Sequence, residues 1–162
     1  MTRTSGSDLV LRHAEPADHA RVIAVLDDWW GGRSMAAMLP RLFFVHFRPT
    51  SFVLEQDDRL VAFLVGFVSQ TDPTQAYVHF VGVDPRARGL GAGRRLYDAF
   101  LAAVREQGCT VVRAVTSPVN TGSIAFHTSI GFQVEDAEAT DYDGPGEDRV
   151  RFVLRLDGAA AG

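Results

Sequence analysis

The 162-residue sequence contains no lysine, and all 16 of its basic residues are arginine, which is typical of a GC-rich bacterial genome. It has one cysteine, Cys109, and therefore no internal disulfide framework. Its longest apolar stretches, such as residues 60–68, are too short to span a bilayer as a helix. The first residues, MTRTSGSD, lack the apolar segment of a secretory signal. These absences predict a cytoplasmic protein that neither spans a membrane nor depends on disulfides.

The balance of charge is equally informative, because the formal net charge is only −4. Nucleic acids and anionic membrane surfaces bind proteins with a basic face, so this balance argues against both as the main partner. With 46% hydrophobic residues, the chain can bury one sizeable core. We therefore expect a single domain over residues 1–162, with its core at about 9–156 and disordered ends at 1–7 and 158–162.

Apolar periodicity predicts alternating strands and helices without an internal repeat. Four helices are expected: one begins at Pro16, one runs from Ser34 as N-cap towards Pro49, one follows a glycine-rich turn, and one begins near Gly122. Pro40 introduces a kink in the second helix. The expected strands cover residues 9–12, 51–55, 60–69, 75–83, 111–116, 132–135 and 149–156. The second and third of these strands form an antiparallel hairpin around a polar turn.

The most informative stretch is VDPRARGLGAGRRLY, residues 83–97, in which a strand enters a glycine-rich turn that opens directly into an amphipathic helix. Gly89, Gly91 and Gly93 allow tight turns and leave successive backbone N–H groups uncovered. The helix N-terminus adds its own unpaired donors and the positive end of its dipole. The segment therefore predicts an anion cradle that suits a pyrophosphate.

Three other glycine-rich phosphate loops do not fit this segment. A nucleotide-triphosphate loop needs G-x-x-x-x-G-K-[ST], and the chain has no lysine. A dinucleotide fingerprint needs G-x-G-x-x-G, whereas here Gly93 is followed by Arg94 at the position of the third glycine. The catalytic H-R-D and D-F-G partners of a protein-kinase loop do not occur downstream.

Residues 88–93, RGLGAG, resemble the acyl-CoA signature of the GNAT N-acetyltransferase superfamily, [RQ]-x-x-G-x-[GA]. NTGSIAFHTSIGF, residues 120–132, resembles the second family motif, N-x-x-[SA]-x-x-[FL]-[YH]-x-x-x-G-F. The resemblance extends over residues 9–156. It implies an α/β (α+β) fold with a mixed, mostly antiparallel sheet of about seven strands and four helices, in which two strands splay apart at an acyl-CoA wedge. It also implies an acetyltransferase that uses acetyl-CoA as acyl donor and no metal.

The resemblance further implies that the pantetheine arm of coenzyme A bonds along the edge of strand 75–83, at Val81 and Val83. Gly82 between them suits either a bulge that opens the wedge or the close approach of a neighbouring side chain. The residues that the resemblance implies for cofactor binding are Val81, Gly82, Val83, Arg88, Gly89, Leu90, Gly91, Ala92, Gly93, Arg94, Asn120, Ser123 and Phe126.

Acyl transfer to an amine requires a base, because an amine with a pKa near ~10 is mostly protonated at neutral pH. His79 lies two residues from Tyr77 and from Val81 on the pleat, and we predict that it is this base; a structural histidine is the alternative. Tyr77, where some family members place glutamate, is either a catalytic group or, preferably, a wall of the pocket. His127 stands where many relatives have a proton-donating tyrosine, so it is either the acid or a structural residue.

In the superfamily, the acceptor is framed by the first two helices and the loop between the last two strands. Here those segments, residues 27–35 and 136–148, carry Trp29, Trp30 and Tyr142 among several acids. Such a site suits a cation with an apolar or aromatic body, so we predict a small primary amine as acceptor. The alternative is that the tryptophans are core and the acids are merely solvated. The resemblance also allows a homodimer.

Three alternatives remain open at this point. The chain could be a non-catalytic acyl-CoA-binding or regulatory module, or it could acetylate a protein N-terminus or a lysine. A covalent mechanism through Cys109 is the third, but this residue lies at the start of a strand with no histidine nearby in the sequence. A buried bystander is the preferred interpretation of Cys109.

Overall fold

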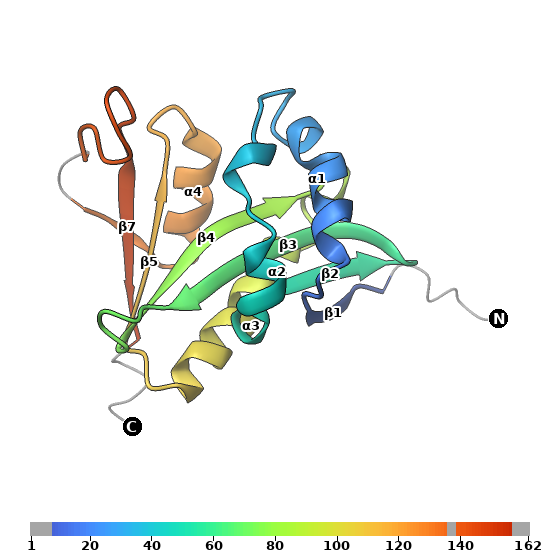
Figure 1. The fold of residues 1–162 in the computed structure, drawn as a ribbon, viewed down its shortest axis with the longest axis horizontal. Helices are drawn as coiled ribbons and strands as arrows, with labels where there is room; N and C mark the ends of the chain where they lie inside the picture. The colour runs from blue at the N-terminus through green and yellow to red at the C-terminus, as the bar shows by residue number, and fades with distance from the viewer. Residues whose placement is uncertain (1–7, 136–138, 157–162) are drawn as a thin grey trace. The chain divides into compact units, whose positions relative to one another are not determined.

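The computed structural model describes residues 8–135 and 139–156 (Figure 1). Its seven strands form one mixed sheet in the order β1-β2-β3-β4-β5-β7-β6. The helices are α1 (Asp18–Trp29), α2 (Leu42–His46), α3 (Ala92–Glu106) and α4 (Thr121–Ser129), with short 3-10 turns η1 (Ala36–Met38), η2 (Arg48–Thr50) and η3 (Pro85–Ala87). The strands are β1 (Val10–His13), β2 (Phe52–Gln56), β3 (Arg59–Val68), β4 (Gln75–Val83), β5 (Val111–Thr116), β6 (Gln133–Val134) and β7 (Val150–Arg155).

The expected α/β fold with a mostly antiparallel seven-stranded sheet and four helices is therefore confirmed. The chain divides into two compact units, a first unit of Met1–Phe67 and Phe80–Val104 and a second unit of Val68–His79 and Arg105–Gly162. A single domain over the whole chain stays a prediction. The expected disordered ends, residues 1–7 and 158–162, lie outside the described residues.

In the first unit, β1, β2 and β3 form antiparallel ladders, with Leu11 opposite Leu54 and Val53 opposite Phe63. The turn between β2 and β3 places Asp57 at φ 53° and Asp58 at φ 64°. Two successive residues with positive φ are the mark of the tight hairpin turns that match strand twist, and Asp tolerates them. The predicted hairpin is thus confirmed.

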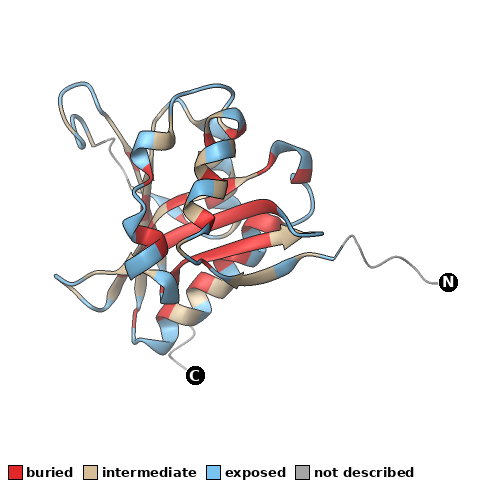
Figure 2. Ribbon diagram, turned by 45° about the vertical axis from the view of Figure 1, so that its right-hand side comes forward, coloured by how far each residue is buried: buried red, intermediate tan, exposed pale blue. Residues whose placement is uncertain are grey.

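The core of the first unit lies on the face of this sheet that α1 and α2 cover (Figure 1). Buried residues lie along the central strands and on the helix faces turned towards them (Figure 2). Large apolar side chains fill this layer: Val22, Leu26, Trp29, Leu39, Phe43, Phe44, Val53, Phe63, Val65 and Phe80. Fully burying one such side chain contributes about 1.5–3 kcal/mol to the free energy of folding. The layer therefore holds α1 and α2 in place on the sheet of the first unit.

The second predicted helix is wrong as a continuous element. Instead of one helix from Ser34, the chain forms η1, α2 and η2 as separate short pieces. Pro40 has no N–H and restricts the residue before it, and Leu39 takes an extended conformation with ψ 87°. Pro49 occupies the first turn of η2, where its missing donor costs nothing. Pro40 therefore separates η1 from α2 rather than kinking one helix.

In the second unit, β4 and β5 pair in parallel from Gln75↔Val111 to Val78↔Ala114. β5 pairs with β7 in antiparallel fashion, and β7 also pairs with the two-residue strand β6. The loop between β6 and β7 is closed by an antiparallel bridge between Ala139 and Arg149. Gly108 follows α3 at φ 93°, the left-handed conformation that ends a helix.

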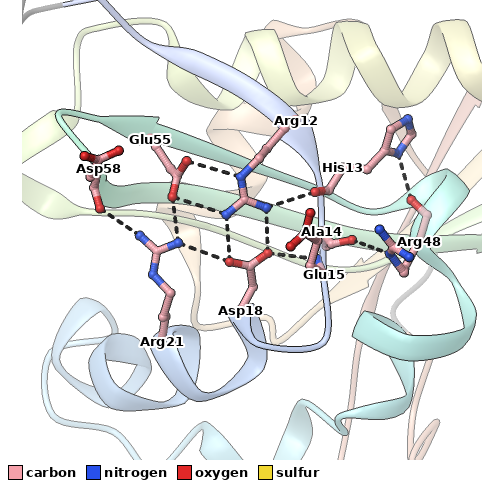
Figure 3. Close-up of polar contacts among 9 residues, drawn as sticks. All are labelled: Arg12, His13, Ala14, Glu15, Asp18, Arg21, Arg48, Glu55 and Asp58. Carbon is pink, nitrogen blue, oxygen red and sulfur yellow. Dashed lines mark hydrogen bonds and ion pairs between the residues drawn. The ribbon is translucent and has the colours of Figure 1, made fainter.

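Four charged side chains join β1, α1 and β2 within the first unit (Figure 3). Arg12 donates two hydrogen bonds to Asp18, of 2.8 and 2.9 Å, and two to Glu55, of 3.2 Å each. Arg21 bridges the same two carboxylates at 3.1 and 2.6 Å. The Asp18 side chain is only 3% exposed, so its charge depends on these partners. The network fixes the start of α1 against the sheet.

Candidate active site

The glycine-rich loop between β4 and α3 lies entirely in the first unit. Gly89 and Gly91 adopt φ 91° and 75°, and a Cβ at either position would meet nothing within 4 Å. These glycines are required by the backbone conformation, not by crowding. The open space above them is where the sequence predicts an anion.

The start of α3 supplies hydrogen-bond donors without partners. Among the residues that the structure describes, the backbone amides of Gly91, Ala92 and Gly93 have no hydrogen-bond acceptor. Ala92 is 2% exposed and Gly93 is buried. Unpaired buried amides cost free energy unless a ligand or water accepts from them, so this cluster fits an anionic group such as a pyrophosphate. Arg88 is exposed beside it and adds positive charge.

Asp84, for which the sequence predicted no role, lies at the start of this loop and stabilises it. It is 2% exposed, and its carboxylate accepts from the backbone N–H of Arg86 at 2.8 Å. It also forms ion pairs of 3.0 Å with Arg59 and with Arg86. The Arg86 hydrogen bonds outweigh burial and hold the pKa of Asp84 below its usual range. An aspartate before proline at the end of a strand was the signal that could have identified it.

Gly82 owes its identity to close packing. A Cβ there would lie 2.6 Å from Phe63 Cε1, and 2.9 and 3.0 Å from Cζ3 and Cη2 of Trp30. The alternation of half-buried and buried residues continues through this position, with Val81 and Val83 half-buried on either side. Of the two interpretations left open by the sequence, the close approach of neighbours is therefore the one that the structure supports.

The two tryptophans predicted to frame the acceptor have different environments. Trp29 is 7% exposed and belongs to the hydrophobic core, where it stacks on Phe63 with ring centroids 6.3 Å apart. Trp30 is half-buried and packs edge-on against Phe80, with centroids 5.0 Å apart. Of this pair, Trp30 is therefore the less buried.

In the second unit, the structure brings together two predicted site residues that are far apart in the sequence. The Tyr77 side chain on β4 hydrogen-bonds Tyr142 of the β6–β7 loop. Burial raises the pKa of Tyr77 above its ordinary value, and the nearby Tyr142 and Asp143 raise it further. This direction of shift disfavours the deprotonated form that a base would need, and the catalytic role of Tyr77 stays a prediction. Tyr142 is 46% exposed, and Arg149 anchors its loop through an ion pair of 2.9 Å with Asp143.

His79 lies on the same half-buried face of β4 as Tyr77, between the buried residues Val78 and Phe80. The base role assigned to His79 stays a prediction.

The second motif forms α4 as expected. Asn120 is its N-cap, and the side-chain oxygen accepts from the backbone N–H of Ser123 at 3.1 Å. Phe126 is half-buried and edge-on to His127, with ring centroids 5.4 Å apart. Ser123 and Phe126 thus lie within two turns of the capped helix start.

His127 has the environment of a structural histidine. It is 4% exposed and stacks on Phe152 of β7 with ring centroids 4.6 Å apart and planes 9° from parallel. Its Nδ1–H donates to the backbone carbonyl of Ser123 at 2.8 Å. Burial lowers the pKa of His127, and the hydrogen bond to Ser123 opposes this only in part. Its burial and its hydrogen bond to Ser123 favour the structural interpretation of His127, and its role as the acid stays a prediction.

Replacing His127 by phenylalanine is expected to leave kcat and its pH dependence unchanged. It should also remove part of the acid sensitivity of the fold. Because the folded-state pKa lies below 6.5, the unfolded chain binds the proton more readily, so His127 contributes stability above pH 6.5 that is lost as the pH falls through the folded-state pKa. Thiol release across the pH range and urea unfolding at neutral and acidic pH test both statements. A shifted pH–rate profile in the variant would restore the acid role.

Two properties of the described residues bear on the class of site. Residues 8–135 and 139–156 hold no group of three or more His, Cys, Asp or Glu side chains arranged to bind a metal ion. Within the same residues, none of the helices combines the length and the apolar character that crossing a membrane requires. Cys109 is 4% exposed, and burial raises the pKa of its thiol, which disfavours a reactive thiolate.

Comparisons with known proteins agree with this geometry. The fold matches the yncA protein of Salmonella typhimurium, solved with its cofactor acetyl-CoA, with a TM-score of 0.72 at 21% identity over 92% of this chain and 94% of that one. A mycothiol acetyltransferase of Nocardia farcinica (strain IFM 10152) is 34% identical over 136 residues, which cover 76% of this chain and 45% of the relative. The L-2,4-diaminobutyric acid acetyltransferase of the same organism is 34% identical over 84 residues, 52% of this chain and 44% of the relative.

The chain spans less than half the length of these two curated relatives. The family model described as "Acetyltransferase (GNAT) family" matches residues 14–132, which include the core of the first unit, the glycine-rich loop and the whole second motif. Most of the chain is thus covered by one family model, and the resemblance seen in the two motifs is confirmed. This chain belongs to the GNAT acetyltransferase family.

Proposed function

We propose that this chain transfers an acetyl group from acetyl-CoA to a primary amine of a small cationic molecule, by direct attack in a ternary complex. The observation that carries the proposal is the set of unpaired amides at Gly91, Ala92 and Gly93, next to glycines in the left-handed conformation. Backbone donors at a helix start bind a pyrophosphate without any lysine, and Arg88 and Arg94 add charge. Asp84 keeps the loop in the conformation that presents these donors.

The pantetheine arm would extend from the loop along Val81 and Val83, whose strand edge offers backbone hydrogen bonds. In the transfer, the amine nitrogen bonds to the thioester carbonyl carbon, the C–S bond breaks, and the thiolate takes up a proton. A backbone N–H near Val81 is the proposed donor to the oxyanion. Because coenzyme A leaves as a reasonably stable thiolate, water can supply its proton, and His127 keeps its structural role.

His79 is the proposed base. It would accept the proton that the ammonium must lose before attack, directly or through one water. Tyr77 and Tyr142, linked through their side chains, are proposed to form one wall of the acceptor site. Aromatic rings beside Asp143 favour a cation with an apolar body. The sequence relative named for L-2,4-diaminobutyric acid acts on a molecule of this kind, a small amino acid with a second amine, and makes it the first acceptor to test.

Replacing His79 by alanine is expected to lower kcat with a primary amine by about 10²–10⁴-fold at neutral pH, with recovery at high pH where the amine deprotonates without help. Replacing Cys109 by serine should leave turnover unchanged, because a direct transfer forms no acyl-cysteine. The measurement is thiol release from acetyl-CoA with a panel of amines that includes L-2,4-diaminobutyrate. Full activity of H79A at neutral pH would show that water or another group is the base, and loss of activity in C109S would favour the covalent route.

Two other functions make different predictions in the same assay. A non-catalytic acyl-CoA-binding or regulatory module would bind acetyl-CoA in calorimetry but release no thiol with any amine. An enzyme that acetylates a protein N-terminus or lysine would release thiol with short peptides and not with small amines. Peptides with free α-amino groups and with internal lysines therefore belong in the panel.

A further inference from the structure

Trp30 lies directly on the strand that is proposed to bind the acyl donor. Gly82 does not have positive φ, so its lack of a side chain is explained only by the aromatic rings that approach it. The six-membered ring of Trp30 occupies the space that a Cβ at Gly82 would need. The same indole is edge-on to Phe80, two residues earlier on the strand. Trp30 therefore covers one face of β4 at van der Waals distance.

The segment that carries Trp30 is held firmly. The backbone N–H of Trp30 bonds to Leu26 O at 3.2 Å, and that of Gly32 bonds to Asp27 O at 2.8 Å. Gly31 and Gly32 adopt φ 68° and 90°, which end α1 and turn the chain back. The Asp27 carboxylate then accepts from the backbone N–H of Met35 at 2.8 Å, which anchors the far side of the turn. The position of the indole is thus defined by its backbone and not only by its rotamer.

We propose that Trp30 is a specificity-determining residue that limits the length of the acyl group, so that the chain uses acetyl-CoA and excludes longer acyl donors. The inference rests on the proposed function, in which the pantetheine arm follows the edge of β4 at Val81 and Val83. Successive strand residues are about 3.3 Å apart, so a ring seated on Gly82 lies beside both of those positions. The thioester end of the donor would then meet the indole on this face of the strand.

The expected selectivity is steric. A methyl group fits beside the indole, whereas each further methylene must displace a ring that lies against Gly82 and Phe80. Phe63 also approaches Gly82 on the side where a Cβ would project, so little space is left there for a longer acyl chain. Discrimination by one methylene in a fitted apolar site amounts to about 10–200-fold in kcat/KM.

The test compares acetyl-, propionyl- and butyryl-CoA with one amine. Trp30→Ala is expected to raise the butyryl-to-acetyl ratio of kcat/KM by at least about tenfold, and Trp30→Phe by a smaller factor, because phenylalanine keeps the contact with Phe80 but not the full reach of the indole. Phe47→Leu is the matched control, since Phe47 is a half-buried aromatic of the same unit that contacts Phe43 and Phe67. Its ratio should equal that of the wild type.

An unchanged ratio in both Trp30 variants would overturn the inference, as would a change confined to the KM of the amine, which would make Trp30 a wall of the acceptor site. If Trp30→Ala does not fold, the butyryl-to-acetyl ratio of kcat/KM in Trp30→Phe tests the inference. The dissociation constants of acetyl-CoA and butyryl-CoA separate this inference from the proposed function. A wild type that releases no thiol but binds acetyl-CoA more tightly than butyryl-CoA, with the preference lost in the Trp30 variants, would refute catalysis and retain the role of Trp30.

Discussion

Replacing Gly91 by glutamate is expected to weaken acetyl-CoA binding by at least about 100-fold, or about 2.7 kcal/mol. Two effects act together. Gly91 adopts φ 75°, where a side chain strains the backbone and moves the amides that follow it. The new carboxylate would also stand at the start of α3, where the pyrophosphate is proposed to accept from the amides of Ala92 and Gly93. Isothermal titration calorimetry with acetyl-CoA measures the change.

Gly108→Glu is a matched control for this variant. Gly108 also has positive φ, 93°, is exposed, and a Cβ there would likewise meet nothing within 4 Å, but it follows the opposite end of α3. The control introduces the same strain and the same charge away from the cradle, so it should bind acetyl-CoA like the wild type. Equal affinities of G91E and wild type would refute the assignment of the loop as the pyrophosphate site.

Replacing Asp18 by asparagine is expected to lower the free energy of unfolding by about 2–3 kcal/mol at neutral pH. The carboxylate accepts from Arg12, from Arg21 and from the backbone N–H of Glu15 at 2.8 Å (Figure 3). An amide cannot accept all of these bonds, and it leaves Glu55 as the only carboxylate for two arginines. The expected loss of unfolding free energy is smaller than for a fully buried ion pair, because the Arg12 and Arg21 side chains are 31% and 34% exposed.

The pH dependence of this loss has a defined sign. Burial raises the pKa of Asp18, but the hydrogen bonds from Arg12 and Glu15 outweigh it, and the folded-state pKa lies below 3.8. Asp18 therefore contributes stability that is fully present above pH 3.8 and is lost as the pH falls through the folded-state pKa. The free energies of unfolding of D18N and of the wild type, measured with urea, should converge at acidic pH. Asp28→Asn, an exposed position on the same helix, should change stability by less than about 0.5 kcal/mol, and an equal loss in both variants would contradict the role of the network.

Much of the fold was predictable because its signals are local. Strand β4 was predicted with the observed bounds, and a helix was expected near Gly122, where α4 begins at Thr121 behind its cap Asn120. The helix expected after Ser34 failed for a reason that is also local: Pro40 separates η1 from α2, and apolar spacing alone could not show that it would end an element rather than kink one.

The candidate site was predictable only in part. The glycine pattern predicted the positive φ of Gly89 and Gly91 at an open helix start, because these are properties of the backbone itself; the anion cradle stays a prediction. The environments of Trp29 and Trp30 could not be distinguished in advance, since adjacent residues on a helix differ in burial according to what packs on them. The pairing of Tyr77 with Tyr142 was likewise out of reach, because it depends on where the β6–β7 loop returns.

By itself, the sequence determined the family, the order of the strands and the glycine conformations of the loop before α3, because short motifs at fixed spacing encode turns, caps and exposed backbone amides. The tertiary structure decided the roles of single side chains. It seated His127 on Phe152 with its proton bound to Ser123, and it placed Trp30 and Phe63 where a side chain at position 82 would have been. Burial and close contact are set by residues distant in the chain, and they decide whether a histidine titrates and why a strand needs a glycine.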